Sequence, residues 1–468
     1  MQPSEPPVID SAEAAGYPPL ARRRREQRGW YFYDWANSAY VTTVGTVLFS
    51  PYLTSVAETA ACGAPGTIAH PCTTNLSVLG LPVSPGSLAF YVVTVSTIVS
   101  ALILPVVGAI ADRSRHKKYL MGAFAWFGSL AAMAMFAVTG GNWVLGTVLL
   151  VLGNISLGMS LVVYDAILCD IATPDERDAV SSRGWALGYL GGGLLLAVNL
   201  VTVLFHASFG MSTELAVRVS LFSAGLWWAG FTLIPMARLG SRPPVNTVAE
   251  PGSLLRASFG QLWVTLRGTR AYPMTLLFLV AYLFFNDGIQ TVIAAASVYG
   301  DKQLGLSQQV LIATILIVQF VGFGGALVFG RAAAHFGSRR TVMGGLLAWI
   351  AVVAIGYTLP AHRVVPFVTL AILIGIVLGG TQALSRSLYS QFVPRGREAE
   401  YFSLYQACER GTSWLGTALF GLVHQLSGSY RPAIVALVGF FVIGLVLLAR
   451  VDVRRGIAEA GNVQPAVV

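Results

Sequence analysis

The sequence predicts an all-α membrane protein with twelve transmembrane helices in two pseudo-symmetric bundles of six. Composition is the first reason: 55% of the 468 residues are hydrophobic and 11% are charged, whereas soluble domains contain about 25% charged residues. The second reason is that apolar segments of membrane-spanning length recur along the whole chain. The third is that the two halves of the chain share short polar patterns at similar spacing.

Twelve apolar segments are long enough to cross a bilayer core of about 30 Å as helices. They are 29–57, 87–111, 119–139, 142–169, 182–205, 216–238, 273–300, 308–335, 341–360, 365–393, 401–427 and 429–451. The first is too long for the apolar region of a signal peptide, so we expect it to be retained. The chain then divides into a disordered cytoplasmic tail (1–28), an N-terminal bundle (29–238), a linker (239–272), a C-terminal bundle (273–451) and a second cytoplasmic tail (452–468).

The distribution of basic residues predicts the orientation. With the N-terminus inside, 24 of the 30 Lys and Arg fall on the cytoplasmic side, and Arg218, Lys302, Arg363 and Arg431 fall outside. The positive-inside rule therefore places both termini in the cytoplasm. Because the basic residues alternate with long apolar runs, topology explains the net charge of +9, and we expect no nucleic-acid partner.

Two loops carry further predictions. The 239–272 linker contains Leu255, Phe259, Leu262, Trp263 and Leu266 on one helical face, which indicates an amphipathic helix on the inner leaflet. Cys62 and Cys72 lie in one loop on the outer side, where disulfides are able to form. A disulfide and two unpaired thiols both fit the sequence there.

Three pairs of segments indicate an internal duplication. Residues 33–42 correspond to 282–291, residues 108–118 to 330–340, and residues 164–177 to 385–398. The three offsets are similar, as a repeated six-helix unit requires.

The segment from Gly108 to Lys118 resembles the loop motif of the major facilitator superfamily (MFS), and it lies between spans two and three, as in that family. It matches at Gly108, Ala111, Asp112 and Arg113 and departs at Ile110 and Arg115. Residues 33–39, 286–291 and 382–387 are similar to the vacuole-effluxer branch, the autophagy-related vacuolar amino-acid exporters and their bacterial relatives. The resemblance implies two six-helix bundles and transport by alternating access, and the yeast branch is associated with export of neutral amino acids.

Ionisable residues inside spans need a reason, because a charge at the bilayer centre costs roughly 2.5–3.5 kcal/mol on insertion scales. Six lie there: Asp34, Asp165, Asp287, Arg386, Glu409 and Arg410. Asp287 is near the middle of its span and has Asn286, Gln290 and Thr291 as helical neighbours. It is a candidate for proton coupling or substrate contact, and the alternative is a hydrogen-bonded structural aspartate.

The other in-span charges allow several roles. Asp34 and Asn37 share a helical face beside Tyr33, which fits substrate contact, coupling or an inner gate. Asp165 and Arg386 occupy equivalent places in the two halves, which favours a gating ion pair. Arg386 could instead bind a substrate carboxylate, or the pair could be static. Gln382 and Glu409 are further candidates for the substrate or coupling site.

Residues at the cytoplasmic ends of the spans are candidates for structural switches. Asp112 and Arg113 belong to the loop motif, and Asp170 with Arg177 resembles the acidic-x6-Arg gate pair of the superfamily. Arg410 is a candidate partner for Asp112, as in the superfamily's cytoplasmic latch. We expect none of these residues to touch substrate.

The sequence lacks the motifs of enzymes and ATP-driven pumps: it has no Gly-x4-Gly-Lys-Ser/Thr, His-Glu-x-x-His or Gly-x-Ser-x-Gly. We therefore expect no enzyme activity, cofactor or metal. The leading hypothesis is a monomeric secondary transporter of the cytoplasmic membrane that moves an amino acid or related zwitterion with protons, using Asp287 and Arg386 as acidic and basic partners. The alternatives are an exporter of drugs or amphipaths with the same fold and a non-transporting receptor or scaffold.

Overall fold

The computed structural model describes residues 16–66, 72–244, 271–411, 413–427 and 429–468. Within these ranges ten helical segments are long and apolar enough to cross a membrane. They are built from α4 (Pro85–Arg113), α5 (Lys117–Ala134), α6 (Trp143–Ile171), α7 (Arg177–Leu204), α8 (Thr213–Arg238), α10 (Pro273–Val298), α11 (Gln308–Phe336), α12 (Ser338–Thr358), α13 (Val364–Gln391), and α16 (Tyr430–Ala436) with α17 (Val438–Arg450).

The other two predicted spans are described in more than one segment. The first consists of α2 (Leu20–Tyr40), a π-helix (Val41–Leu48) and α3 (Phe49–Cys62). The eleventh consists of α14 (Glu398–Gly411) and α15 (Ser413–Ser427), and residue 412 between them lies outside the described residues. The first part of each span carries several ionisable residues. The fold is therefore all-helical with ten candidate spans, and the count of twelve remains a prediction.

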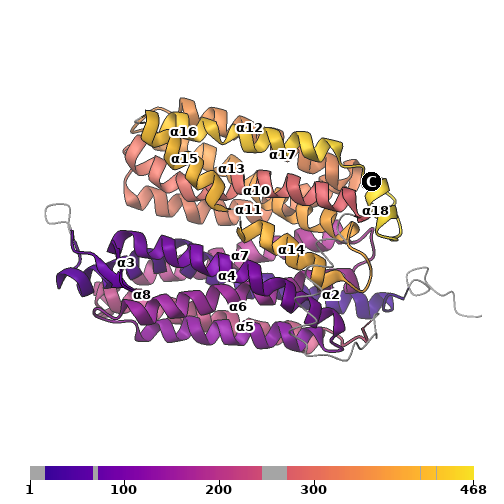
Figure 1. Cartoon of the computed structure of the whole chain (residues 1–468), viewed down its shortest axis with the longest axis horizontal. Coiled ribbons are helices and arrows are strands. Elements are labelled where there is room, and N and C mark those ends of the chain that lie inside the picture. Colours follow the sequence, from indigo (N-terminus) through magenta and orange to yellow (C-terminus); the bar gives the residue numbers. More distant parts are fainter. Residues whose placement is uncertain (1–15, 67–71, 245–270, 412, 428) are drawn as a thin grey trace, which may run out of the picture.

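Helices from the two halves of the sequence form two groups. In Figure 1 the helices from α2 to α8 lie in the lower half of the view, and those from α10 to α17 lie in the upper half except α14, which reaches down into the lower group. Between the groups α7 packs against α11 and α13, and α14 packs against α4 and α6. These contacts between the N-terminal and C-terminal halves bring the buried charges described below together.

The ends of the chain are more ordered than the sequence predicts. The disordered tail was expected to reach residue 28, but α2 already begins at Leu20. One physical reason is charge pairing, because Arg23 Nε lies 3.0 Å from Glu176 Oε2. After residue 452 the chain forms α18 (Val453–Glu459), and the Asn462 side chain donates to two backbone carbonyls near the end of α13. The amphipathic helix expected around 255–266 lies outside the described residues.

A small covalent and hydrogen-bonded unit follows α3. Cys62 and Cys72 are joined by a disulfide, which is one of the two arrangements that the sequence allowed. Beyond it β1 (Leu76–Val78) pairs antiparallel with β2 (Leu81–Val83).

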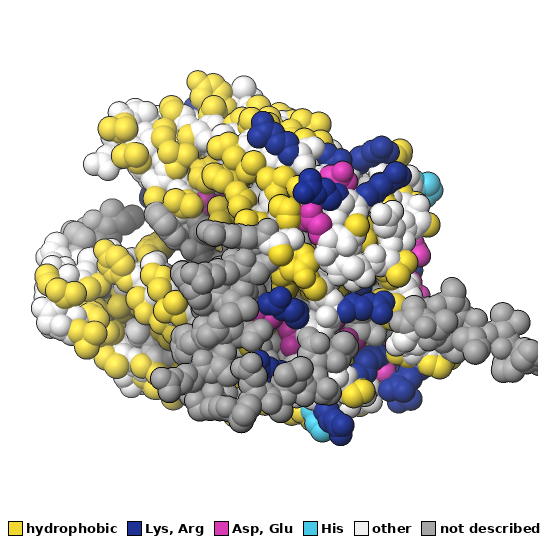
Figure 2. Space-filling view, turned by 45° about the vertical axis from the view of Figure 1, so that its right-hand side comes forward, with side chains coloured by type: hydrophobic (Ala, Val, Ile, Leu, Met, Phe, Trp, Pro, Cys, Tyr) yellow, Lys and Arg dark blue, Asp and Glu magenta, His cyan; other side chains and the backbone are white. Residues whose placement is uncertain are grey.

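Basic side chains gather at one end of the molecule. Figure 2 shows Lys and Arg concentrated on the right-hand part of this face, while hydrophobic side chains dominate the upper left. We call the end that carries the start of α2, the end of α4 and α18 the basic end.

Candidate functional site

Arg386 of α13 is the centre of a buried charge cluster. Its Nη2 lies 3.1 Å from Asp34 Oδ2 of α2, and its Nη1 lies 3.3 Å from Asp165 Oδ1 of α6. Its Nε donates to Ser181 Oγ of α7 at 3.0 Å. The side chains of Arg386 and Asp165 are only 3% and 1% exposed. One guanidinium therefore ties the C-terminal half to three helices of the N-terminal half.

Aromatic rings surround the guanidinium of Arg386. Its central carbon lies 4.8 Å from the Trp30 ring centroid and 5.4 Å from those of Tyr164 and Trp185. Trp30 and Tyr164 are stacked on each other with centroids 4.2 Å apart. Cation–π attraction is stronger where the cation is desolvated, so these rings help to stabilise the buried positive charge.

A chain of polar contacts leads from this cluster into α14. Gln406 Nε2 donates to Asp165 Oδ2 at 2.8 Å and to Glu409 Oε2 at 3.2 Å. Arg410 Nε donates to Gln406 Oε1 at 3.3 Å. Asn286 Nδ2 of α10 donates to the Glu409 carbonyl at 3.2 Å. The in-span charges of the two halves thus form one connected network that ends beside Asp287.

Asp287 of α10 is buried against α15. Its Oδ2 accepts a hydrogen bond from the Gly416 backbone of α15 at 2.7 Å. Its Oδ1 and the Thr291 hydroxyl have no hydrogen-bond partner among the described residues. Asp287 and Arg386, the acidic and basic partners expected for a zwitterion, have different contacts: Asp287 accepts from the Gly416 backbone, and Arg386 contacts Asp34 and Asp165.

The close approach of α15 to α10 requires glycine at position 416. A Cβ there would lie 2.2 Å from Thr291 Oγ1 and 3.1 Å from Asp287 Oδ2. We expect Gly416→Ala to lower the free energy of unfolding by about 1–3 kcal/mol, the usual penalty for overpacking. Gly421→Ala in the same helix is the matched control, since its Cβ would meet nothing within 4 Å. Thermal unfolding of both variants in detergent measures the difference, and equal melting temperatures would contradict the predicted clash.

Asp112 of the loop motif caps α14. Its Oδ1 and Oδ2 accept hydrogen bonds from the Ala399 and Glu400 backbones at 2.9 and 2.8 Å. Gly108 permits this contact, because a Cβ there would lie 2.5 Å from the Ala399 carbonyl oxygen. The expected pairing of Asp112 with Arg410 is wrong. Arg410 lies ten residues beyond Glu400 in α14, which is roughly 15 Å along a helix.

Asp170 and Arg177 do not form the expected gate pair in this structure. Asp170 Oδ2 instead lies 3.4 Å from Lys117 Nζ. Arg177 Nη1 donates to the Ser390 carbonyl of α13 at 2.7 Å. Arg177 therefore contacts the opposite half directly, and Arg113 is the last residue of α4, beside Asp112.

The remaining predicted site residues lie around the cluster. Asn37 Nδ2 donates to the Tyr33 carbonyl at 2.8 Å. Gln382 Oε1 accepts a hydrogen bond from the Tyr189 hydroxyl of α7 at 2.8 Å, a further contact between the halves. Gln290 is half-buried, one turn beyond Asn286.

Sequence reasoning did not single out three residues of the cluster: Ser181, Gly184 and Trp185. A Cβ on Gly184 would lie 2.7 Å from Asp34 Oδ2 and 3.1 Å from Arg386 Nη2, so glycine leaves room for that ion pair. Glycines and serines are common in packed membrane helices, and no local pattern distinguishes these from the others. Among the described residues, no group of three or more His, Cys, Asp or Glu could hold a metal ion.

The chain is similar to known proteins over nearly its whole length. Residues 22–461 match the family described as vacuole effluxer Atg22-like. A Bacillus subtilis (strain 168) protein named as the uncharacterized MFS-type transporter YxiO is 30% identical over 434 residues, which are 92% of this chain and 95% of that protein. Autophagy-related protein 22-1 of Penicillium rubens is 26% identical over 565 residues, covering 97% and 94% of the two chains.

Solved structures share the fold. A bacterial homologue of the iron transporter ferroportin in an outward-facing state gives a TM-score of 0.66 at 14% identity, covering 92% of this chain and 99% of that one. The proton:xylose symporter XylE gives 0.67 at 12% identity, covering 92% and 96%. At such low sequence identity, the substrates of these solved proteins do not indicate the substrate of this chain. The structural similarity shows that the chain has the MFS fold. The chain is an integral multi-pass membrane protein and belongs to the Atg22-like vacuole-effluxer family of MFS-type transporters, which are not enzymes.

Proposed function

We propose that the protein is a secondary active transporter that moves an amino acid or related zwitterion across the cytoplasmic membrane, coupled to protons. The observation that carries this proposal is the buried cluster of Arg386 with Asp34 and Asp165 between the two halves. A zwitterion needs both an acidic and a basic partner, and the cluster offers both signs. A protein that acted only as a static scaffold would have no need for buried charges between its halves.

Alternating access gives the cluster a role as a gate. Three contacts join α13 to the N-terminal half. Arg386 and Gln382 of α13 contact helices of the N-terminal half, and Arg177 of α7 contacts α13. Opening the basic end must separate these contacts. A substrate carboxylate that replaced Asp34 or Asp165 on the guanidinium would offset part of the free energy lost when these contacts separate. It could do so because a planar guanidinium binds any carboxylate in the same geometry.

Asp287 is the proposed coupling residue. Its carboxylate is buried, one oxygen accepts the hydrogen bond from the Gly416 backbone, and the other has no partner among the described residues. Protonation would remove the negative charge that strengthens the hydrogen bond to α15. Proton binding at Asp287 would thereby change how α15 is held against α10, which links the proton to a helix that moves.

The proposed orientation places the basic end in the cytoplasm. The Lys and Arg concentration seen in Figure 2 supports it through the positive-inside rule. The disulfide between Cys62 and Cys72 lies at the end of the first span away from the start of α2, on the proposed oxidising side. We propose that the protein acts as a monomer.

Export of drugs or amphipaths is the second candidate. The aromatic side chains around Arg386 and the stacked pair of Tyr282 and Tyr405, with centroids 4.3 Å apart, favour it. Uptake and counterflow in proteoliposomes, tested on a panel of amino acids with and without an imposed pH gradient, separate the two candidates. We expect at least one amino acid to exchange and to accumulate with the pH gradient. Transport of amphipathic dyes without transport of any amino acid would favour the second candidate.

A further inference from the structure

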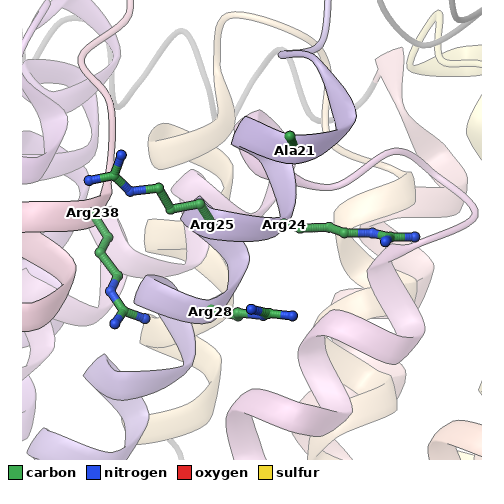
Figure 3. Close-up of a pocket in the computed structure, with 5 residues that line it drawn as sticks. All are labelled: Ala21, Arg24, Arg25, Arg28 and Arg238. Atoms are coloured by element: carbon green, nitrogen blue, oxygen red, sulfur yellow. The ribbon is translucent and has the colours of Figure 1, made fainter.

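Exposed arginines at the basic end form a cluster on α2 and α8. Four arginines and one alanine line a hollow of about 530 Å³: Ala21, Arg24, Arg25, Arg28 and Arg238. In Figure 3, Arg25 and Arg238 lie on one side of α2, and Arg24 and Arg28 lie on the other. None of the four arginines forms an ion pair with an acidic side chain that the structure describes, whereas Arg22 and Arg23 do.

The cluster continues into an aromatic surface on the same face of α2. At 100° per residue, Arg24, Arg25 and Arg28 lie within about 100° of one another, and Phe32 and Trp35 fall in the same sector one to three turns further on. Both aromatic side chains are half-buried. This face therefore changes from basic to aromatic along the direction that leads into the membrane.

Helix α8 forms the other side of this aromatic surface, and we call the surface between α2 and α8 the aromatic seam. Trp227 stacks on Trp35 with centroids 5.5 Å apart, and its Nε1 donates to the Trp35 carbonyl at 3.2 Å. Phe231 lies 5.7 Å from Trp35. Arg238 is two helical turns beyond Phe231, so α8 repeats the sequence of aromatic and then basic groups. The helices are close at the basic end, because a Cβ on Gly29 would lie 2.6 Å from Arg238 Cβ.

The arginines of the cluster are like charges held close together. Arg24, Arg25 and Arg28 lie on α2, and Arg238 approaches them from α8. The positive-inside rule accounts for basic residues on this side of the membrane, but it does not require them on one face above an aromatic seam. An anion bound between the guanidinium groups would offset their mutual repulsion.

We propose that this seam binds an anionic phospholipid of the cytoplasmic leaflet. Arg25 and Arg238, which lie on the same side of α2, hold the phosphate of the headgroup, since guanidinium groups bind phosphate through paired N–H donors, and Arg28 adds positive charge beside them. One acyl chain lies against Phe32, Trp35 and Phe231. The membrane surface supplies this ligand next to the site, because anionic lipids concentrate at basic juxtamembrane segments.

Native mass spectrometry of the full-length protein in detergent tests the proposal, with phosphatidylglycerol, phosphatidylcholine and inorganic phosphate as separate probes. We expect the first phosphatidylglycerol to bind at least about tenfold more tightly than phosphatidylcholine. The triple variant Arg25→Gln, Arg28→Gln and Arg238→Gln should lose that preference. Because these side chains are exposed, the substitutions should preserve the fold.

The matched control removes three exposed arginines elsewhere: Arg331→Gln, Arg340→Gln and Arg454→Gln. It should keep the lipid preference within about twofold. An equal loss in the control would mean that net charge alone attracts the lipid, and would overturn the site. Equal binding of phosphatidylcholine, or inorganic phosphate that binds as tightly as phosphatidylglycerol, would overturn the lipid assignment. The Phe32→Ala variant should weaken lipid binding and leave phosphate binding unchanged.

Discussion

Replacing Arg386 by glutamine is expected to abolish transport and to lower the free energy of unfolding by about 3–5 kcal/mol. The physical reason is that Asp34 and Asp165 would remain buried as two carboxylates without the cation that neutralises them. Thermal unfolding in detergent and counterflow in proteoliposomes measure the two effects. Arg183→Gln is the control, since Arg183 is an exposed arginine of α7, and it should change neither quantity appreciably.

A triple variant separates the structural role of the cluster from its role in transport. Asp34→Leu, Asp165→Leu and Arg386→Met together replace the three charged side chains by apolar ones of similar volume. Replacing a whole buried ion cluster by well-packed apolar side chains is often close to neutral, whereas removing one partner is strongly destabilising. We therefore expect the triple variant to regain at least half of the lost stability and to stay inactive. An Arg386→Gln variant as stable as the native protein would show that the two carboxylates do not depend on the guanidinium.

Replacing Asp287 by asparagine is expected to abolish accumulation driven by a pH gradient while the protein stays folded. The asparagine side-chain oxygen can still accept the hydrogen bond from the Gly416 backbone. The change removes only the group that binds a proton. We expect the free energy of unfolding to change by less than about 1 kcal/mol, while exchange without a gradient continues. Proteoliposome assays with and without an imposed pH gradient measure this difference.

Two variants sharpen the Asp287 test. Asp287→Leu removes the hydrogen-bond acceptor as well and leaves the Gly416 N–H unpaired, which should lower the free energy of unfolding by about 1–2 kcal/mol. Asp301→Asn removes an exposed carboxylate from the far end of the same span, and should leave gradient-driven flux intact. Unchanged accumulation in Asp287→Asn would exclude this residue from proton coupling, and the gate proposed at Arg386 would have to be tested on its own.

Local sequence patterns identified the in-span charges but not their partners. Asp165 and Arg386 were matched because the halves are repeats, and they are in contact. Asp34 was placed near the inner end of its span with no indication that it shares Arg386. Arg410 was expected to bind Asp112, yet Asp112 caps the other end of α14. Which charges pair depends on how helices far apart in the sequence are packed.

The sequence by itself determined that this chain lies in a membrane, which of its loops and tails are basic, and which few residues carry charge inside the spans. It could do so because hydropathy and charge act locally along the chain, and the bilayer sorts segments one by one. Only the tertiary structure decided that Arg386 joins Asp34 to Asp165 and that Asp287 is hydrogen-bonded to α15 at Gly416. Those contacts are set by helix packing between the two halves, where Gly184 and Gly416 leave the space that a side chain would fill.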